Sequence, residues 1–338
     1  MILQSGSLEH MFFCQNPFVF AVHHDDHFPA GDGQLQPVER RVFRPDGDMD
    51  PKAPWRMYYG ERVPGFPAHP HRGFETVTAV VRGTVDHTDG LGSKGRYEDG
   101  DVQWMTAGRG LQHAEMFPLK RTDGPNHLEL FQIWLSLDSA HRMAEPAYKM
   151  LWQEDIPVVT LTDENGLSTK VTVIAGEEAG QSAPLPTPDS WAADPKNRLQ
   201  IKLYALEPGA AAVLPRGTET MNRSLYFYDG DALRIDGKRF ADKSYAFVRA
   251  DAELILKNEG SETARVLLLE AEPIPEPIVA RGPFVMSSEE EIREAFKDYR
   301  ETQFGGWPFA EDEVYHAPEQ VRFAEYPDGT VEYPAKEK

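Results

Sequence analysis

The sequence contains a single cysteine, Cys14, among its 338 residues. An intrachain disulfide is therefore excluded, and a lone thiol is compatible with a reducing compartment. The first twenty residues, MILQSGSLEHMFFCQNPFVF, have neither the positive start nor the long apolar core of a signal peptide. No stretch of the sequence reaches the roughly 18 apolar residues that cross a membrane as a helix. We therefore expect a cytoplasmic protein without a membrane segment.

Basic residues are scarce. Lys and Arg number 35 against 55 Asp and Glu, which gives a net charge of −20. A field of this sign repels phosphate backbones and anionic lipid, and no run of about five basic residues offsets it locally. The sequence therefore argues against direct binding to nucleic acid or to a membrane surface, but it leaves a protein partner open.

Glycine and proline are frequent, at 27 residues each, in an otherwise ordinary globular composition. In 127–137 (HLELFQIWLSL) apolar side chains recur at period two, which places them on one face of a strand. Segment 75–85 (ETVTAVVRGTV) is rich in β-branched residues. Short strands separated by regular turns predict an all-β fold of the sandwich or barrel type.

The strand pattern is interrupted once, by a proline-rich stretch, so the chain is interpreted as two β-domains in tandem. Ser288 begins the one convincing helix, because Glu291 completes a capping box and an apolar stripe follows. The predicted division is an irregular segment 1–40, a first domain 41–180, a linker 181–198, a second domain 199–306 that includes helix 288–303, and a polar, loosely held tail 307–338.

Two pairs of metal-ligand residues stand out. His69 and His71 are two apart in GFPAHPHRGFE, and His113 and Glu115 are two apart in GDVQWMTAGRGLQHAEM. In an extended strand, residues i and i+2 point to the same face, about 6.6 Å apart, so that each pair can converge on one ion. Two such pairs on neighbouring strands predict one divalent metal held by three imidazoles and a carboxylate. Ten of the eleven histidines lie at or before His141, which places any such site in the first domain.

Three segments, HPHRGFETVT, DVQWMTAGRGLQHAEM and GPFVMSSEEEIREAF, resemble the hallmark segments of the pirin family, two-domain members of the cupin superfamily. The resemblance implies two double-stranded β-helix (cupin, jelly-roll) barrels, face to face, with a C-terminal helix packed back on the first. It also implies a metal in the N-terminal barrel alone, on His69, His71, His113 and Glu115. Iron, as Fe²⁺, is the metal described for pirins, while Ni, Mn, Cu, Co and Zn stay open.

The resemblance further implies an activity like that of quercetin 2,3-dioxygenase, in which O₂ cleaves a flavonol or related enolisable phenol. Glu115 would then fix the metal, or act as the base for a substrate hydroxyl if it leaves the ion. The alternative is a metal- or redox-dependent transcriptional co-regulator that binds a protein partner without turnover. Unrelated chemistry, such as isomerisation or hydrolysis, is a third reading. A deep apolar cavity beside the metal would favour a small-molecule substrate.

Further residues near the motifs are assigned by their position in the sequence. Glu75 follows His71 by four residues, and we expect it beside the ligands or facing the substrate rather than on the metal. Gln103 and Met105 are expected to line the same cavity. His87 and His127 are interpreted as hydrogen-bonded polar residues without a ligand role, and His23, His24 and His27 as a cluster without a predicted scaffold.

Overall fold

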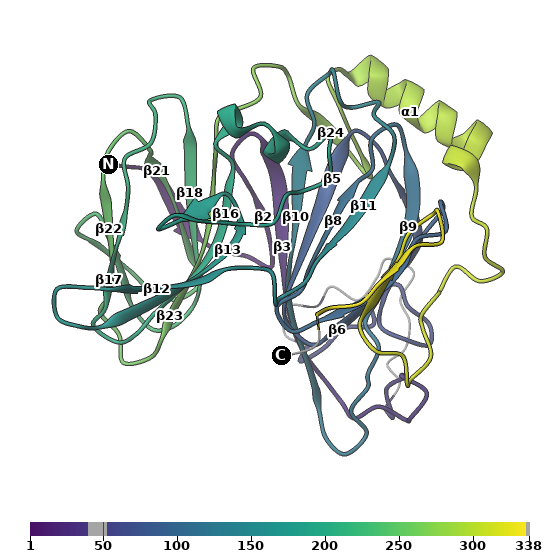
Figure 1. Ribbon diagram of the computed structural model, residues 1–338, viewed down its shortest axis with the longest axis horizontal. Coiled ribbons are helices and arrows are strands. Elements are labelled where there is room, and N and C mark those ends of the chain that lie inside the picture. The colour runs from purple at the N-terminus through teal and green to yellow at the C-terminus, as the bar shows by residue number, and fades with distance from the viewer. Residues whose placement is uncertain (40–49, 51–52, 336–338) are drawn as a thin grey trace. The chain divides into compact units, whose positions relative to one another are not determined.

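The structure is a computed structural model that describes residues 1–39, 50 and 53–335. The chain forms two units, each assembled from two stretches of sequence. Met1–Ala21 and Asp155–Pro275 make the first unit, and Val22–Glu154 and Glu276–Lys338 make the second. Both units are built of strands, and the α-helix found among the described residues belongs to the second (Figure 1). The predicted all-β fold with two β-domains and a helix near the C-terminus is confirmed.

Two antiparallel sheets make up the first unit. The larger has the order β1 (Ile2–Ser7), β21 (Ser244–Arg249), β18 (Asn222–Asp229), β23 (Ala264–Ala271), β16 (Gln200–Leu206), β13 (Ser168–Ala175) and β12 (Val158–Thr162). The smaller has the order β17 (Ala211–Leu214), β22 (Leu254–Asn258), β19 (Leu233–Ile235) and β20 (Lys238–Phe240). The connections contain the hairpin β14 (Glu177–Glu178) and β15 (Gln181–Ser182) and the 3₁₀ turns η1 (Trp191–Ala193) and η2 (Pro195–Asn197).

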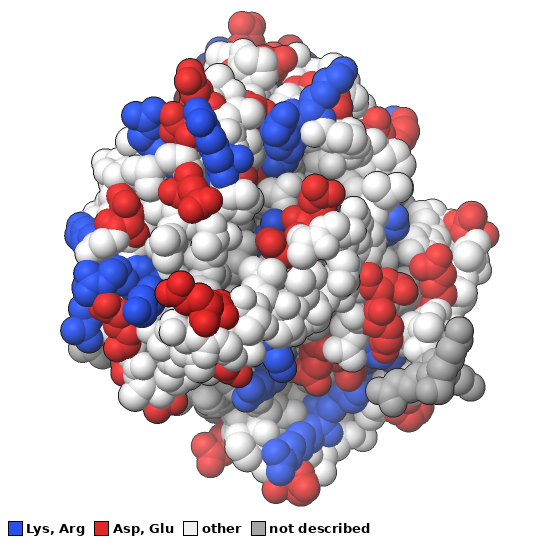
Figure 2. All heavy atoms as spheres, turned by 60° about the vertical axis from the view of Figure 1, so that its left-hand side comes forward, with Lys and Arg blue, Asp and Glu red and all other residues white. Residues whose placement is uncertain are grey.

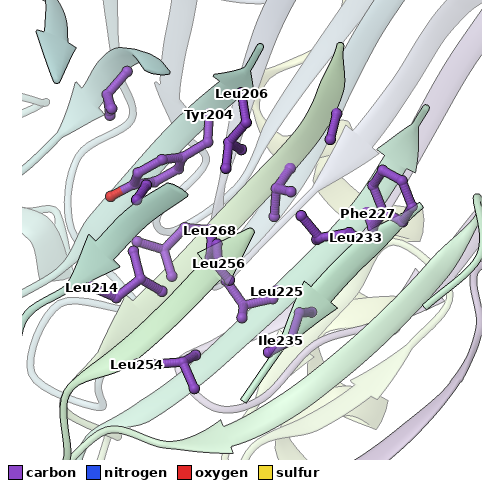
Figure 3. Packing of buried hydrophobic residues seen from close by; sticks show 14 of the residues in the cluster. Tyr204, Leu206, Leu214, Leu225, Phe227, Leu233, Ile235, Leu254, Leu256 and Leu268 are labelled. Atoms are coloured by element: carbon purple, nitrogen blue, oxygen red, sulfur yellow. The ribbon is translucent and has the colours of Figure 1, made fainter. Parts of the chain in front are cut away.

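The core of the first unit lies between these sheets. On β22, Leu254 and Leu256 are buried while Ile255 between them is 52% exposed, as the period of two requires. Figure 3 shows these leucines directed toward side chains of the larger sheet, including Leu225 and Leu268. His10 is the one histidine of this unit. The first unit therefore contains no group of imidazoles that could bind a metal.

The second unit contains two further sheets. One has the order β11 (Ala147–Leu151), β8 (Val102–Thr106), β5 (Phe74–Arg82), β10 (Asn126–Ser136) and β3 (Phe18–Phe28), and β2 (Met11–Phe13) is hydrogen-bonded to β3. The other has the order β27 (Val331–Glu332), β26 (Phe323–Glu325), β7 (Lys94–Glu98), β6 (Thr84–Asp89), β9 (Leu111–Met116) and β4 (Gly65–His71). A short hairpin, β24 (Val279–Arg281) and β25 (Phe284–Met286), precedes α1 (Glu289–Thr302) and the turn η3 (Gln303–Gly305).

Helix α1 begins where the capping box predicts. The Ser288 hydroxyl accepts a hydrogen bond from the Glu291 backbone N–H at 3.2 Å, and three glutamates occupy the first turn. The buried face of the helix packs on β25 through Ile292 and Ala295. The Arg72 guanidinium ties the helix to the β4–β5 turn by an ion pair with Asp298 at 2.8 Å. The helix is thereby fixed directly beside the histidine motif.

The division of the chain differs from the predicted one. Residue 41, the predicted start of the first domain, lies outside the described residues. Strands β12 and β13 belong to the first unit because β13 pairs with β16, with Val171 opposite Tyr204. The predicted linker 181–198 therefore lies within the first unit, and α1 belongs to the second unit rather than to the predicted second domain. Local composition could not show these pairings, because they join strands distant in sequence.

Both predicted irregular ends contain strands. In 1–40, β1 pairs with β21, with Gly6 opposite Tyr245, and β2 and β3 follow. In the predicted loose tail, β26 pairs with β7, with Ala324 opposite Gly95. The yellow C-terminal segment in Figure 1 follows the sheet that contains β6 and β9. In these segments apolar and polar side chains alternate only weakly, and the glycines and polar residues among them hide the pattern. The strands form because partner strands stabilise them.

The surface carries both signs of charge. On the face shown in Figure 2, acidic and basic side chains are interspersed. The net charge of −20 is therefore not gathered into one acidic patch on that face. No helix among the described residues has the length and apolar character needed to span a bilayer.

Candidate metal centre

The histidine motifs lie on two paired strands. On β4 and β9, His69 is directly opposite His113, and a shift of register separates Phe66 from His69. Gly73, at φ +85°, then turns the chain from β4 into β5. A Cβ at this position would stand 1.8 Å from the Val285 carbonyl oxygen, so only glycine allows β25 to approach the motif so closely. The two motifs and the C-terminal hairpin therefore meet at one place.

Three histidines converge there. One ring nitrogen from each of His69, His71 and His113 lies within 4.8 Å of those of the other two. The ring centroids are 4.8 Å apart for His69 and His71, 4.4 Å for His69 and His113, and 4.9 Å for His71 and His113. The predicted convergence of the His pair with His113 on one face is therefore found in the structure. We call these three residues the histidine cluster.

The hydrogen bonds of the cluster suit a metal ion. His69 Nδ1 lies 2.8 Å from the Pro67 carbonyl and His71 Nδ1 lies 3.4 Å from the Pro283 carbonyl. A carbonyl can only accept, so each Nδ1 carries the proton and each Nε2 keeps a free lone pair. His71 Nε2 and both ring nitrogens of His113 are buried with no partner among the described residues. Such buried, unpaired nitrogens are costly, and a bound cation would satisfy them.

Burial sets the protonation of the cluster. It lowers the pKa of His69 to about 4, and it lowers the pKa values of His71 and His113 well below the ordinary range, with neighbouring histidines adding to the effect. All three imidazoles are therefore neutral at pH 7, which is the form that binds a metal.

Metal-free protein is expected to lose stability as the pH falls from 7.5 to 5.5. Below pH 6.5 the unfolded chain protonates His69, whereas the folded chain does so only near pH 4. The resulting loss for this residue is at most about 1.4 kcal/mol at pH 5.5. Urea denaturation with a chelator present should show a smaller loss for His69→Gln than for the wild-type chain. An identical pH dependence of the two proteins would contradict the pKa assigned to His69.

Glu115 does not join the histidine cluster. Its carboxylate accepts hydrogen bonds from Thr78 Oγ1 at 3.0 Å, from Tyr97 Oη at 3.2 Å and from the side-chain amide of Gln132. Burial raises the pKa of Glu115, while the nearby His87 and these three donors oppose the rise. The predicted fourth ligand is therefore a buried, fully hydrogen-bonded carboxylate two residues along the strand from His113, on the same face.

Glu75 is placed differently from the prediction. Its carboxylate accepts hydrogen bonds from Trp104 Nε1 at 3.0 Å and from Thr106 Oγ1 at 2.8 Å. It is three residues from Thr78 on β5, and an odd separation in a strand places two side chains on opposite faces. Thr78 is bonded to Glu115, so Glu75 faces away from Glu115 rather than toward the ligands or a substrate.

We expect Glu75→Gln to leave the metal content unchanged and to lower the free energy of unfolding by about 1–3 kcal/mol. The reason is that the two donors lose a buried charged acceptor. Metal analysis and urea denaturation of the same preparation measure both quantities. Loss of the metal in this variant would contradict the assignment of Glu75 to the opposite face.

Gln103 and Met105 lie on the face of β8 that carries the site. They are opposite Thr78 and Thr76 on β5, and both are fully buried. Gln103 is 3.5 Å from Tyr97 Oη, and Met105 packs with Ala107 and Leu111. Neither residue borders the cavity described below.

Sequence analysis missed several neighbours of the site. On β10, Gln132 donates to Glu115, and the Trp134 ring lies 5.2 Å from the His71 ring. They alternate with Ile133 and Leu135, the apolar positions from which the strand was predicted, so they occupy the other face. His87 packs flat on Tyr148 and lies 5.5 Å from the His113 ring. The alternation along β10 could have revealed Gln132 and Trp134, because it places them together on the face opposite the apolar one.

His23, His24 and His27 lie on β3. His23 Nε2 is 3.2 Å from the Glu129 carboxylate, and His24 Nδ1 is 2.6 Å from Tyr58 Oη. His27 and Asp25 form a second group of ligand-type atoms with His127, on the surface. Strand β3 is the scaffold that the sequence did not reveal.

Both ring nitrogens of His127 already have partners, as predicted for this residue. Nε2 lies 2.8 Å from the Asp25 carboxylate and Nδ1 lies 3.1 Å from the Arg82 guanidinium. The exposed fractions of His27 and Asp25 are 62% and 42%. This surface group therefore differs from the histidine cluster, in which three buried nitrogens, on His71 and His113, have no partner among the described residues.

A cavity of about 660 Å³ borders the histidine cluster at His69. His71 and His113 are 3% and 0% exposed, so His69 is the partly exposed member of the cluster. The cavity combines apolar and aromatic side chains with charged ones: Tyr59, Glu61, Arg62, Phe66, Pro67, Ala68, His69, Glu311, Asp312 and Glu313. Its volume is in the range of small-molecule sites.

Comparison with known proteins identifies the family. The Pirin model matches residues 16–135, and the model of the Pirin C-terminal cupin domain matches residues 203–305. A pirin-like protein of Solanum lycopersicum is 37% identical over 273 residues, which cover 80% of this chain and 87% of the relative. The chain belongs to the pirin family. Human pirin is 34% identical over 275 residues, 79% of this chain and 88% of the relative.

A crystal structure of a quercetin 2,3-dioxygenase from Acinetobacter baumannii resembles this pirin along most of its length. The TM-score is 0.70 at 28% sequence identity, and the match covers 90% of this chain and 98% of that one. The cupin fold expected from the sequence motifs is thereby confirmed for the two β-units.

Proposed function

We propose that this pirin is a metal-dependent dioxygenase that acts on a flavonol or a related enolisable phenol. The histidine cluster carries the proposal, because it brings three imidazoles together, has nitrogens on His71 and His113 without a partner among the described residues, and borders a cavity of small-molecule size at His69. The likeness to a quercetin 2,3-dioxygenase supports the reaction class. The co-substrate would be O₂, and carbon monoxide would be released with the cleaved phenol.

His69, His71 and His113 would hold one divalent metal per chain, with Glu115 as a fourth ligand if its carboxylate turns from its present donors. We propose Fe²⁺, although imidazole and carboxylate ligands also suit Ni, Mn, Cu, Co and Zn. When bound, the metal supplies the redox centre at which a phenolate and O₂ can react.

Glu115 is the proposed base for the substrate hydroxyl. Its carboxylate is buried, and burial raises its pKa, which strengthens it as a proton acceptor. Thr78 and Tyr97 donate to one oxygen and Gln132 to the other, so the carboxylate is held in a fixed orientation. A proton accepted there stays away from solvent, because Glu115 is 1% exposed.

A co-regulator without turnover would not need the cavity at His69, and for this reason we favour the enzyme. We also propose a cytoplasmic location, because the sequence contains a single cysteine and a lone thiol is compatible with a reducing compartment.

The test combines metal analysis with a flavonol assay. Protein purified without added metal is analysed for metals and then mixed with quercetin, first without oxygen and then with air. The proposal predicts flavonol loss and carbon monoxide formation that need both the metal and O₂. A stoichiometric metal without turnover would overturn the enzyme and favour the partner-binding protein. In Glu115→Gln, retained metal with lost turnover supports the role of base, whereas lost metal makes Glu115 a ligand.

A further inference from the structure

The C-terminal segment that forms one wall of the cavity lies outside the family models. The second of those models ends at residue 305, and the cavity is bordered by Glu311, Asp312 and Glu313. The opposite side contains Tyr59, Phe66 and His69, all between 59 and 69. The approach to the histidine cluster is thus shaped by a segment that the two family models do not cover.

Specific hydrogen bonds fix the segment in place. The Glu313 side chain is 8% exposed and accepts hydrogen bonds from the backbone N–H groups of Arg62 and Val63. The Asp312 carbonyl accepts the Ala68 N–H at 2.9 Å. The Trp307 indole donates to the Glu311 carbonyl at 2.9 Å. Because Glu311 and Asp312 make these contacts through their backbone carbonyls, changes to their side chains should leave the wall in position.

The charges around the cavity are predominantly acidic. Four carboxylates, on Glu61, Glu311, Asp312 and Glu313, face one guanidinium, that of Arg62. Arg62 pairs with Glu311 at 3.3 Å and with Glu313 at 3.5 Å. An anionic ligand therefore meets an excess of negative charge on its way to His69, and a cationic one is attracted.

The two aromatic side chains of the cavity supply an apolar surface between these charges. The Tyr59 and Phe66 rings lie 5.8 Å apart, and the Phe66 ring lies 6.2 Å from the His69 ring. A planar phenol can pack on such rings while its hydroxyls approach the cluster.

We propose that residues 311–313 form the entrance to the metal site and select neutral or cationic phenols against anionic ones. The inference rests on the proposed function in taking the histidine cluster as the metal site, and it adds the charge class of the substrate. Because the inference concerns the binding of phenols, it can be tested by measuring affinities under conditions without turnover.

The experiment uses three catechols that differ in the charge of the side chain: 3,4-dihydroxybenzoate, 4-methylcatechol and dopamine. Their dissociation constants are measured by calorimetry under anaerobic conditions, with the full chain as purified and its metal content known. We expect dopamine to bind best and the benzoate worst. Glu311→Gln and Asp312→Asn should each reduce the ratio of the dissociation constant of 3,4-dihydroxybenzoate to that of dopamine by about threefold, and the double variant should reduce it by about tenfold. Added salt should narrow the wild-type ratio.

Glu319→Gln is the matched control, since it removes one negative charge from an exposed position of the same segment that does not border the cavity. It should leave the ratio unchanged. Equal binding of the benzoate and dopamine by the wild-type chain, no catechol binding, or equal effects of Glu319→Gln and Asp312→Asn would each overturn the inference. A pirin that ranks the catechols as expected but does not turn over quercetin would overturn the proposed function and leave this inference standing.

Discussion

Replacing His113 with alanine is expected to lower the metal affinity of this pirin by at least about a hundredfold. Loss of a residue that merely supports a ligand commonly costs 10- to 100-fold, and loss of the ligand itself costs more. His113 is fully buried beside His69 and His71, and neither of its ring nitrogens has a partner among the residues that the structure describes. A water molecule in the space left by the imidazole would be a weaker ligand.

Metal content after purification, followed by competition with a chelator, measures the effect. His127→Ala is the control, because it removes an imidazole from the surface group while leaving the histidine cluster intact. The thermal midpoint supplies a second readout, since a metal that binds only the folded chain stabilises it. Unchanged metal affinity in His113→Ala would show that the cluster is not the metal site.

The cluster could be predicted from the sequence because its geometry is local. Two ligands at i and i+2 share a face in any strand, so the spacing of His69 and His71 required only that the strand form. The pairing of β4 with β9, which brings His113 opposite His69, was a further step. It followed from the expectation of neighbouring strands and from the resemblance to pirins.

The surroundings of the cluster were harder to predict because they depend on which face each residue takes. Glu75 and Thr78 are both polar residues of β5, yet Thr78 faces Glu115 and Glu75 faces Trp104. Spacing from His71 cannot decide this, because the turn at Gly73 separates the strands and resets the alternation. Counting the alternation within β5 and β10 would have placed Thr78 and Gln132 on one side.

Local sequence patterns could not predict which strands pair to form the two units. Strand β1 pairs with β21, more than 230 residues away, and β26 pairs with β7 across a similar separation. The amphipathic signal of β1 is weak, since only Ile2 and Ser5 are even half-buried. Such strands are stabilised by their partners, so their sequences alone read as irregular.

A buried ion pair fixes the C-terminal segment beyond the cavity. The Arg96 guanidinium makes two hydrogen bonds of 2.7 Å to the Asp86 carboxylate, and both side chains are 0% exposed. Its other hydrogens bind carbonyls of the segment: those of Ala317 at 2.8 Å, Gln320 at 2.9 Å and His316 at 3.1 Å. All five N–H donors of the guanidinium are thereby hydrogen-bonded.

Arg96→Ala is therefore expected to cost about 3–5 kcal/mol of unfolding free energy, because it leaves the Asp86 carboxylate buried without its cation and three carbonyls without their donor. Arg109→Ala is the contrast: its ion pair with Glu145 at 2.8 Å has exposed fractions of 57% and 74%, and its loss should cost no more than about 1 kcal/mol. Urea denaturation compares the two variants, and limited proteolysis should cleave near 316–320 faster in Arg96→Ala alone. Equal costs in the two variants would mean that Arg96 does not anchor the segment. The expected difference would instead show that one arginine of β7 secures the segment whose acidic residues line the approach to His69.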